Sequence, residues 1–288
     1  MLLSQAKALL HLYDLKAQRK LGQHFLIDED ILASIVAAAG LTSGGIVIEV
    51  GPGLGVLTRR LAEAGARVIA VELDARLVEL LKKELASFSN VEIIHADILK
   101  LSPRQLLEGY STSAEPVPGY KVVANLPYYI SSPVLRHFLQ DSLKPASMLV
   151  MLQKEVGEAV AASPGKMRLL SVIIQFYGRP TIVSYVPAKS FYPSPKVDSV
   201  VLRIDSYARA PVEVQDVESF FDIVSCGFRA PRKQLRNSLS QALEMPPSQA
   251  ARLLEKAEID ARQRAETLSL AEWEKLWRVF APFRSNVC

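Results

Sequence analysis

Residues 46–55 of the chain read IVIEVGPGLG, an apolar run that leads into a turn containing three glycines. The apolar run is typical of a buried strand, and a helical pattern follows from Val56. Glycine has no β-carbon, so it permits a tight turn and lets the backbone approach a ligand closely. In open α/β sheets, ligands bind outside the carboxyl ends of the strands. These residues therefore predict a strand, a ligand-binding turn and a helix in succession.

Outward from this turn, short apolar runs alternate with helical stretches from Gly44 to about Asp205. Strands that alternate with helices are joined by right-handed crossovers and form a parallel, doubly wound sheet. The alternation therefore predicts an α/β fold for this part of the chain. The predicted strands span residues 46–50, 67–72, 91–94, 120–124 and 146–152, and the predicted helices span residues 56–64, 75–87 and 131–140.

The pattern changes towards the end of the chain. Two β-branched runs, residues 182–186 and 200–204, are separated by a proline-rich stretch and predict an antiparallel pair at the edge of the sheet. We predict two domains, an α/β domain of residues 1–210 and a small all-helical domain of residues 211–288. The helices predicted beyond Pro211 span residues 217–228, 231–243, 248–257 and 271–280.

The composition is that of an ordinary globular protein. The chain has 288 residues, enough for about two domains, and 49% of them are hydrophobic, which excludes a largely disordered chain. The two cysteines, Cys226 and Cys288, belong to no metal-binding or disulfide pattern and fit a reducing compartment. No apolar run is long enough to cross a membrane, and the first residues do not resemble a signal peptide. We expect a cytoplasmic protein without a bound metal ion.

Two acidic residues follow the next two predicted strands, in positions that suit a nucleoside. Glu72 ends the second strand, 21 residues after Gly51, where a carboxylate can accept hydrogen bonds from ribose hydroxyls. Asp97 follows the third strand and can accept a hydrogen bond from an adenine amino group. A nicotinamide or flavin dinucleotide is one candidate ligand, but the turn reads GxGxG and not the GxGxxG of dinucleotide-binding folds. S-adenosylmethionine, an adenosyl ligand without a pyrophosphate, fits this turn as well or better.

The fourth predicted strand ends in Asn125-Leu126-Pro127-Tyr128, which indicates a reaction on a base. The exocyclic amine of a base is a poor nucleophile because its lone pair is delocalised into the ring. The side-chain oxygen of Asn125 and the backbone carbonyl of Leu126 could accept the amino hydrogens and direct the lone pair at a methyl donor. Tyr128 supplies a face for stacking, and catalysis would consist of positioning and dipole stabilisation. The alternative interpretation is an Asn-Pro turn beside a core tyrosine.

Together these motifs resemble those of the ribosomal RNA adenine N6-dimethyltransferase family, in particular its bacterial small-subunit members. The matching motifs run in the family's order over nearly the whole chain. The resemblance implies a Rossmann-like S-adenosylmethionine-dependent methyltransferase domain with a small C-terminal all-helical domain that binds RNA. The motifs are residues 20–26 (KLGQHFL), 49–58 (EVGPGLGVLT), 71–74 (VELD), Asp97, residues 125–128 (NLPY), 191–199 (FYPSPKVDS) and 264–273 (RAETLSLAEW).

The resemblance also implies roles for individual residues. Tyr128 and Phe191 would sandwich a target adenine, because a base must leave its stack to reach such a pocket and aromatic faces offset that cost. For Phe191 the alternative is a core aromatic beside a proline turn, although its Phe-x-Pro-x-Pro-Lys context favours exposure at a cleft. His24 departs from the asparagine common at its position in this family, but either side chain can donate a hydrogen bond. The implied catalytic residues are Asn125, Leu126, Tyr128 and Phe191, and the implied S-adenosylmethionine ligands are His24, Leu26, Gly51, Glu72, Asp97 and Asn125.

The positive charge is distributed as an RNA partner would require, although the net charge is only +4. Basic residues gather within residues 1–27 and in a run without an acidic residue between Asp222 and Glu244. This run brackets Pro231, where we predict that a helix starts, and would hold a structured RNA through phosphate contacts. A solvated basic helix face is the alternative. The candidate RNA-binding residues are Lys20, Arg229, Arg232, Lys233 and Arg236.

The substrate that the resemblance implies is a pair of adjacent adenosines in a hairpin near the 3′ end of small-subunit ribosomal RNA. Each adenosine would receive two methyl groups, and the partner would be an assembling small subunit that the protein joins as a monomer. One alternative is a relative that methylates large-subunit RNA and confers antibiotic resistance, which the helical tail disfavours. A second is a non-catalytic RNA-binding assembly factor, and a third is a dinucleotide oxidoreductase. Glu72, Asp97 and Asn125 argue against the second, and the GxGxG turn and residues 125–128 argue against the third.

Overall fold

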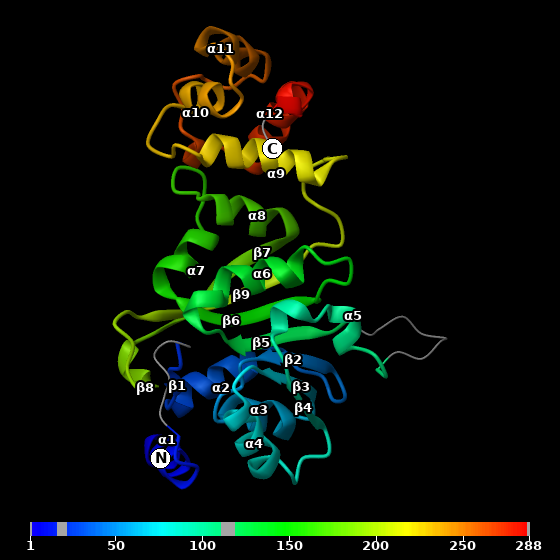
Figure 1. The fold of residues 1–288 in the computed structure, drawn as a ribbon, viewed down its shortest axis with the longest axis vertical. Coiled ribbons are helices and arrows are strands. Elements are labelled where there is room, and N and C mark those ends of the chain that lie inside the picture. The colour runs from blue at the N-terminus through cyan, green and yellow to red at the C-terminus, as the bar shows by residue number, and fades with distance from the viewer. Residues whose placement is uncertain (1, 16–21, 111–118, 287–288) are drawn as a thin grey trace. The chain divides into compact units, whose positions relative to one another are not determined.

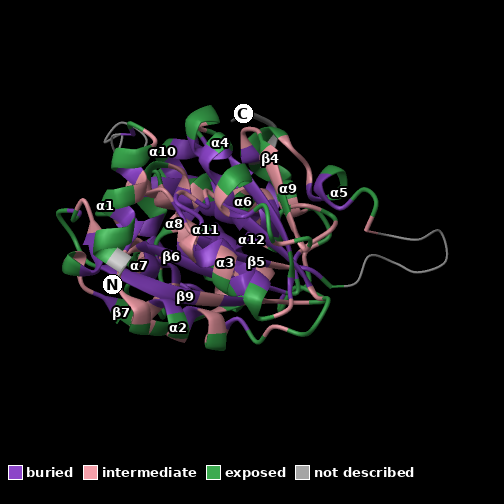
Figure 2. Ribbon diagram, turned by 90° about the horizontal axis from the view of Figure 1, so that it is seen from below, coloured by how far each residue is buried: buried purple, intermediate pink, exposed green. Residues whose placement is uncertain are grey.

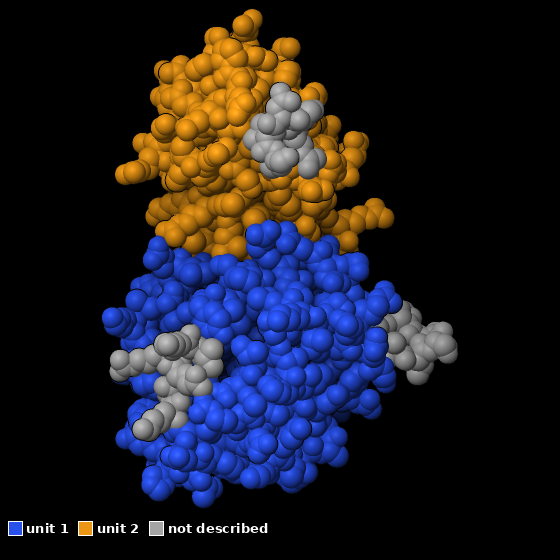
Figure 3. Space-filling model, viewed as in Figure 1, with its two compact units in different colours: residues 1–157, 179–206 blue, residues 158–178, 207–288 orange. Residues whose placement is uncertain are grey.

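The computed structural model describes residues 2–15, 22–110 and 119–286. The chain divides into two compact units, the first comprising residues 1–157 and 179–206 and the second residues 158–178 and 207–288 (Figure 3). This division differs from the predicted domains, residues 1–210 and 211–288. Residues 158–178, predicted in the first domain, belong to the second unit because apolar side chains such as Val172 and Phe176 pack into its core.

The first unit is built on a seven-stranded sheet with the strand order β4-β3-β2-β5-β6-β9-β7 (Figure 1). Neighbouring strands from β4 to β6 are parallel, as predicted, whereas β9 runs antiparallel to β6. β7 lies beside β9 at the edge of the sheet. The strands are β2 Ile46–Val50, β3 Arg67–Glu72, β4 Val91–His95, β5 Lys121–Asn125, β6 Ser147–Gln153, β7 Gly178–Val186 and β9 Ser199–Ser206.

Helices connect these strands, and those predicted after the first, second and fourth strands are present. The second of them, α4, begins where predicted because the Asp74 carboxylate accepts a hydrogen bond from the backbone N–H of Arg76 and caps the helix. α1 agrees with the helical spacing of Leu2, Ala6 and Leu10, whereas α2, α5 and α7 were not predicted. The helices of this part of the chain are α1 Leu2–Leu12, α2 Glu29–Ala38, α3 Val56–Glu63, α4 Ala75–Glu84, α5 Pro103–Leu106, α6 Ser131–Leu139 and α7 Lys154–Val160.

The centre of the sheet is apolar and buried. All five residues of β2 are buried, and Figure 2 shows β6 and β9 buried along most of their length. A strand buried on both faces reads as a continuous apolar run without polar alternation, and such runs identified these strands closely. Glu49 is the exception within β2, since its carboxyl is buried together with the apolar side chains around it.

A second, two-stranded sheet joins two distant sequence motifs. β1 (Phe25–Leu26) pairs antiparallel with β8 (Phe191–Tyr192), so that Leu26 lies opposite Phe191 and Phe25 opposite Tyr192. Two-residue strands carry no periodicity, and neither strand was predicted. The pairing places the backbone of residues 24–26 next to the proline-rich segment that follows β8.

The second unit is helical, as the sequence predicted for residues beyond 211. Its core contains Phe220, Leu239 and Trp273, each completely buried. The helix predicted from residue 231 begins four residues later, at Leu235, because residues 229–234 form a turn in which the backbone N–H of Lys233 bonds to the carbonyl of Ala230. The helices are α8 Leu169–Tyr177, α9 Val217–Phe228, α10 Leu235–Ala242, α11 Pro247–Lys256 and α12 Leu270–Phe280.

Gly227 allows α9 and α12 to approach each other closely. A β-carbon at this position would clash with the Cη2 atom of Trp273, whose side chain is completely buried. We expect Gly227→Val to lower the free energy of unfolding by about 1–3 kcal/mol, because a packed core accommodates added volume only by strain. Ser225→Val, at an exposed position of the same helix, is the control. Thermal unfolding measures the stability of both variants. An equal loss of stability in Gly227→Val and Ser225→Val would contradict this account.

Candidate active site

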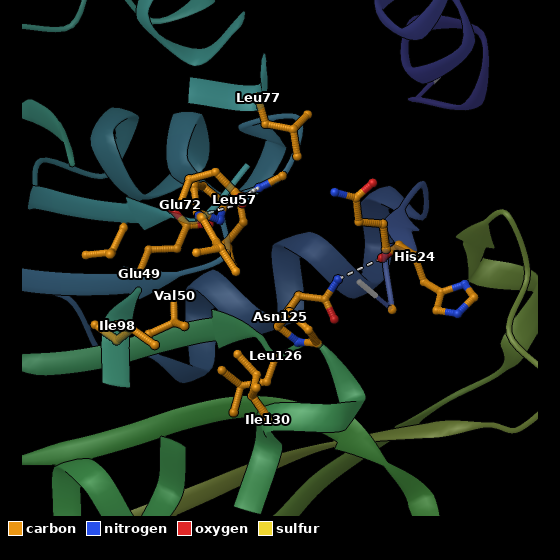
Figure 4. Close-up of a pocket in the computed structure, with 18 of the residues that line it drawn as sticks. His24, Glu49, Val50, Leu57, Glu72, Leu77, Ile98, Asn125, Leu126 and Ile130 are labelled. Carbon is orange, nitrogen blue, oxygen red and sulfur yellow. Dashed lines mark hydrogen bonds between the residues drawn. The ribbon is translucent and has the colours of Figure 1, made fainter. Parts of the chain in front are cut away.

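A pocket opens at the carboxyl ends of the parallel strands of the first unit. β5 lies on the opposite side of β2 from β3, so the chain reverses its direction of travel across the sheet between β2 and β5. Such a switch point is where open α/β sheets bind their ligands. Figure 4 shows lining residues from several strands converging on this space. The pocket is lined chiefly by residues 22–26, 49–54, 71–73, 96–99 and 125–130.

The glycine turn predicted after β2 forms one wall of the pocket. Gly51, Gly53 and Gly55 all have positive φ values, of 65°, 59° and 76°, which side chains with a β-carbon rarely adopt. A β-carbon on Gly55 would lie 2.8 Å from Leu81 Cδ2 of α4, so the third glycine also lets α3 pack against α4. Gly51 lines the pocket, as expected of a residue predicted to contact S-adenosylmethionine.

Glu72 occupies the end of β3, with its carboxylate held by backbone donors. Oε1 accepts hydrogen bonds from the N–H groups of Leu73 and Asp74 at 2.9 and 3.0 Å, and Oε2 accepts one from Gly53 at 3.2 Å. Burial raises the pKa of this carboxyl above its ordinary value, and the three hydrogen bonds partly offset that rise. The carboxylate therefore links β3 to the glycine turn and faces the pocket with a fixed orientation.

Asp97 lies after β4 and also lines the pocket. Its Oδ1 accepts a hydrogen bond from the N–H of Leu99 at 3.1 Å and caps the short 3-10 helix at Ile98–Lys100. Oδ2 of Asp97 has no hydrogen-bond partner among the described residues, so it can accept a hydrogen bond from a ligand. Ile98 and Leu99 add apolar surface beside the carboxylate, which suits the flank of a planar ring.

Asn125, the last residue of β5, is held by the backbone of the N-terminal motif. Its Nδ2 donates to the carbonyl oxygen of His24 at 3.1 Å (Figure 4). This bond fixes which end of the amide is the nitrogen and leaves Oδ1 as an acceptor at the pocket. Leu126 is buried, its N–H bonds to the carbonyl of Met151, and Pro127 has no N–H to offer.

Tyr128 lines the pocket and is half-buried. Burial raises the pKa of its phenol above the ordinary value. His24 also lines the pocket, but in Figure 4 its ring points away from Glu72, and Nδ1 lies 2.6 Å from the carbonyl oxygen of Pro193. Nδ1 of His24 is therefore engaged with a protein group, and the predicted contact of His24 with S-adenosylmethionine stays a prediction.

Phe191 does not occupy the exposed position predicted for it. Its side chain is 2% exposed, packs in a core cluster beneath the sheet and does not line the pocket. Pairing of β8 with β1 turns the side chain inwards, opposite Leu26, and this explains the difference. The structure brings Leu26 to the pocket but not Phe191, so the predicted sandwich of Tyr128 and Phe191 is not assembled here.

Among the pocket residues to which sequence reasoning gave no role are Tyr129 and Glu49. Tyr129 is half exposed and lines the pocket next to Tyr128, and the doubled tyrosine was the only signal for it. Glu49 is 1% exposed and lines the base of the pocket, and its Oε2 has no hydrogen-bond partner among the described residues. A single acid within the apolar run IVIEV was the signal for Glu49.

The buried carboxyl of Glu49 predicts a pH dependence of stability. Burial raises its pKa to about 8, with a further contribution from nearby Glu72, whereas in the unfolded chain it ionises near 4.5. The folded state therefore holds a proton that the unfolded state releases, so the stabilisation is complete below pH 4.5 and is lost as the pH rises to about 8. Each pH unit in this window is worth about 1.4 kcal/mol.

We expect the Glu49→Gln variant to lack this dependence, so that its stability relative to the unsubstituted protein rises between about pH 5 and pH 8. Urea unfolding of both proteins across this range measures the difference. Glu72, whose pKa is also raised, is present in both proteins, so the comparison isolates the effect of removing the Glu49 carboxyl. If the free energy of unfolding changes with pH in the same way in both proteins, the raised pKa of Glu49 is contradicted.

The predicted basic residues are exposed where the structure describes them, but their local structure differs from the prediction. Arg229, Arg232 and Lys233 lie in the connection between α9 and α10, and only Arg236 lies on a helix. Among the described residues, none of the four forms an ion pair, and Lys233 donates to the Gln241 side chain at 3.3 Å. We call these four residues the basic loop. Lys20 falls outside the described residues.

The donor set of the pocket fits S-adenosylmethionine. Two carboxylates stand at neighbouring strand ends and apolar side chains flank one of them. The glycine turn lies near Glu49, a buried acid whose Oε2 has no hydrogen-bond partner among the described residues. The described residues contain no group of three or more His, Cys, Asp or Glu side chains that could hold a metal ion. Within the same part of the chain, no helix has the length and hydropathy to cross a membrane.

Comparison with known proteins agrees with this geometry. A family model described as Ribosomal RNA adenine dimethylase matches residues 14–276. Ribosomal RNA small subunit methyltransferase A of Dehalococcoides mccartyi is 47% identical over 97% of this chain and 94% of that protein. The protein of the same name from Geobacillus thermodenitrificans is 38% identical over 96% of both chains.

Solved structures show the same fold. The crystal structure of the 23S rRNA methyltransferase ErmE matches with a TM-score of 0.68 and 26% identity, covering 89% of this chain and 99% of that one. A dimethyladenosine transferase from Plasmodium falciparum matches with a TM-score of 0.72 and 24% identity, covering 90% of this chain and 98% of that one. The chain therefore belongs to the ribosomal RNA adenine dimethylase family, an enzyme family with a Rossmann-like fold that uses S-adenosylmethionine.

Proposed function

We propose that this protein dimethylates two adjacent adenosines in the hairpin near the 3′ end of small-subunit ribosomal RNA. It acts as a monomer on the assembling small subunit in the cytoplasm, with S-adenosylmethionine as the methyl donor. The observation that carries this proposal is the fixed amide of Asn125 at the end of β5, beside the two carboxylates of a nucleoside pocket. An acceptor held in this orientation is what methylation of an exocyclic amine requires.

In this proposal Asn125 and Leu126 activate the adenine amine. Oδ1 of Asn125 and the backbone carbonyl of Leu126 accept the two amino hydrogens and direct the nitrogen lone pair towards the methyl donor. S-adenosylmethionine supplies a methyl group on a positively charged sulfur, so no strong base is needed. The N6 nitrogen forms the new bond to carbon, the bond from carbon to sulfur breaks, and the amine proton leaves to solvent. A second transfer follows on each adenosine, in which the monomethylated amine has one hydrogen left to donate to these acceptors and loses it to solvent as the second methyl group is added.

Cofactor binding is assigned to the opposite side of the pocket. Glu72 accepts hydrogen bonds from the ribose hydroxyls and Asp97 from the adenine amino group of S-adenosylmethionine, with Ile98 against the ring. Gly51 and the backbone of residues 24–26 approach the methionine part. The assignment is supported by the positions of these groups at the strand ends and by their shared contact with the pocket.

The target base enters by leaving its stack. Extruding a base costs a few kcal/mol, less in a hairpin loop than in a duplex, and stacking on an aromatic side chain returns about 1–3 kcal/mol. Tyr128 provides that face, and the exposed Tyr129 stands at the mouth of the pocket. Because Phe191 is buried, we assign the stacking to Tyr128 and give Phe191 a packing role.

Methylation of large-subunit RNA is the second candidate, because the ErmE structure, 26% identical, is that of a 23S rRNA methyltransferase. Relatives with 37–47% identity over most of the chain are named small subunit methyltransferases and favour the first candidate. A non-catalytic assembly factor is disfavoured by the presence of Asn125, Glu72 and Asp97 at the pocket.

The experiment uses labelled S-adenosylmethionine with small subunits that lack the modification. After incubation the RNA is digested and separated, and we expect label in N6,N6-dimethyladenosine from the 3′-terminal hairpin. Large subunits treated in parallel should take up no label. Absence of label in competent small subunits would overturn the proposal, and label in large subunits alone would support the second candidate.

A further inference from the structure

The hydroxyl of Tyr128 is tied to a strand on the other side of the pocket wall. Its oxygen lies 2.8 Å from Oγ of Ser199, the first residue of β9, which is 71 positions away in the sequence. Ser199 is completely buried. A buried serine needs a hydrogen-bond partner, and the phenol supplies it. The two hydroxyls therefore join the turn after β5 to the sheet.

This contact constrains a side chain that its own backbone holds weakly. Tyr128 begins a 3-10 helix of only three residues, Tyr128–Ile130, which has no side-chain cap. Ser199, in contrast, lies opposite Gln153 in a strand that pairs with β6 along its length. Anchoring the far end of the phenol to such a strand leaves the ring little freedom to turn about its two side-chain torsions.

His24 constrains the same ring from one of its faces. The two ring centroids are 5.6 Å apart and the planes are inclined by 29°, a stacked arrangement. His24 is held in turn, because its Nδ1 lies 2.6 Å from the carbonyl oxygen of Pro193. A carbonyl only accepts, so Nδ1 carries the proton in this contact. His24 therefore packs against one face of the Tyr128 ring, so a base would stack on the other face.

We propose that Ser199 and His24 are positioning residues that hold the Tyr128 ring in the orientation in which its free face stacks on the target adenine. This inference rests on the proposed function, because it concerns how that adenine is presented to Asn125. It assigns to His24 a task different from binding S-adenosylmethionine. It also explains how a single aromatic face can suffice while Phe191 is buried, since a ring that is already oriented loses less freedom when a base binds.

A double-mutant cycle tests the contact between Ser199 and Tyr128. Tyr128→Phe keeps the ring and removes only the hydroxyl, and Ser199→Ala removes its partner. We expect each variant to lower kcat/KM for unmodified small subunits about fivefold, the effect of one hydrogen bond, and the double variant to be no worse than either. The dissociation constant for S-adenosylmethionine, measured by calorimetry, should stay unchanged in all three.

A matched control is Ser190→Ala. Ser190 is also buried, and its Oγ donates to Asp28 at 2.7 Å without touching Tyr128. This variant loses a hydrogen bond of the same kind, so it is expected to lower thermal stability but not kcat/KM. If Ser190→Ala lowers kcat/KM as much as Ser199→Ala does, the inference is overturned. It is also overturned if the losses of Tyr128→Phe and Ser199→Ala multiply in the double variant.

Stacking is measured directly with RNA that carries 2-aminopurine at the target position, whose fluorescence is quenched by an aromatic neighbour. We expect Ser199→Ala and His24→Ala to weaken the quenching seen with the unsubstituted protein, and Ser190→Ala to leave it unchanged. Unaltered quenching in the first two variants would refute the positioning role. If the unsubstituted protein forms no dimethyladenosine, the proposed function itself has failed. If the unsubstituted protein forms dimethyladenosine normally but the losses of Tyr128→Phe and Ser199→Ala multiply in the double variant, only the positioning role of Ser199 and His24 is overturned.

Discussion

Asn125→Ala is expected to lower kcat for methyl transfer by about 10²–10³-fold, the usual effect of removing one fixed dipole from a reaction centre. The variant loses Oδ1, which is the acceptor assigned to the adenine amine, and Nδ2, which donates to the carbonyl of His24 at 3.1 Å. Asn125 is only half-buried at the end of β5, so the fold should persist. Single-turnover transfer of labelled methyl groups to unmodified small subunits measures the effect.

The control for Asn125 is another asparagine with a purely structural contact. Asn90 donates from Nδ2 to the carbonyls of Ala62 and Ala66 at 3.0 and 2.8 Å, away from the pocket. Asn90→Ala should lower the melting temperature and leave kcat unchanged, the reverse of the expected behaviour of Asn125→Ala. Turnover by Asn125→Ala within a few fold of the unsubstituted protein would remove this residue from the mechanism.

Replacing the basic loop, residues Arg229, Arg232, Lys233 and Arg236, by alanine is expected to weaken RNA binding on the order of 10²-fold at low salt. The four side chains are exposed, and none forms an ion pair with a described residue, so their charge is available to phosphates. Each phosphate contact releases counterions. The slope of log affinity against log salt concentration should therefore become shallower by about 3. Filter binding of the hairpin RNA at several salt concentrations gives both quantities.

The matched control removes the same number of charges from the same unit. Arg262, Arg264, Lys275 and Arg278 are each paired with an acidic side chain, so their alanine variants should change the salt slope little. Kcat at saturating RNA should be nearly normal in the basic-loop variant, because none of its residues lines the pocket. If the slope of log affinity against log salt concentration is unchanged in the basic-loop variant, RNA binds to another surface.

Much of the fold could be predicted because the central strands of the first unit are buried. Apolar runs such as Ile46–Val50 are typical of buried strands, and the bounds of the five parallel strands were predicted to within one residue. β7 was predicted to begin at residue 182 but begins at Gly178. Short elements were missed for the opposite reason. β1 and β8 have two residues each, and each forms only because the fold brings it beside the other. No local sequence pattern therefore predicts them.

The basic loop shows how a correct set of residues can be given the wrong local structure. Pro231 favoured a helix start, but the chain instead turns at residues 229–234, and the N–H of Leu235 bonds to the carbonyl of Gln263. A long-range hydrogen bond decides where α10 begins. The residue types and their exposure were predictable, whereas the helix boundary depended on a partner 28 positions away.

The sequence by itself determined that this chain is an α/β protein with a nucleoside pocket, and it placed Glu72, Asp97 and Asn125 there. The reason is geometric: the carboxyl ends of parallel strands meet at one edge of the sheet, so residues at strand ends share a site wherever they lie in the chain. Only the tertiary structure decided the direction of individual side chains. The His24 contact with Pro193 spans 169 positions and the Tyr128 contact with Ser199 spans 71. Burial of Phe191 likewise follows from its pairing with Leu26. Such contacts depend on which distant segments pack together, and that is a property of the folded chain as a whole.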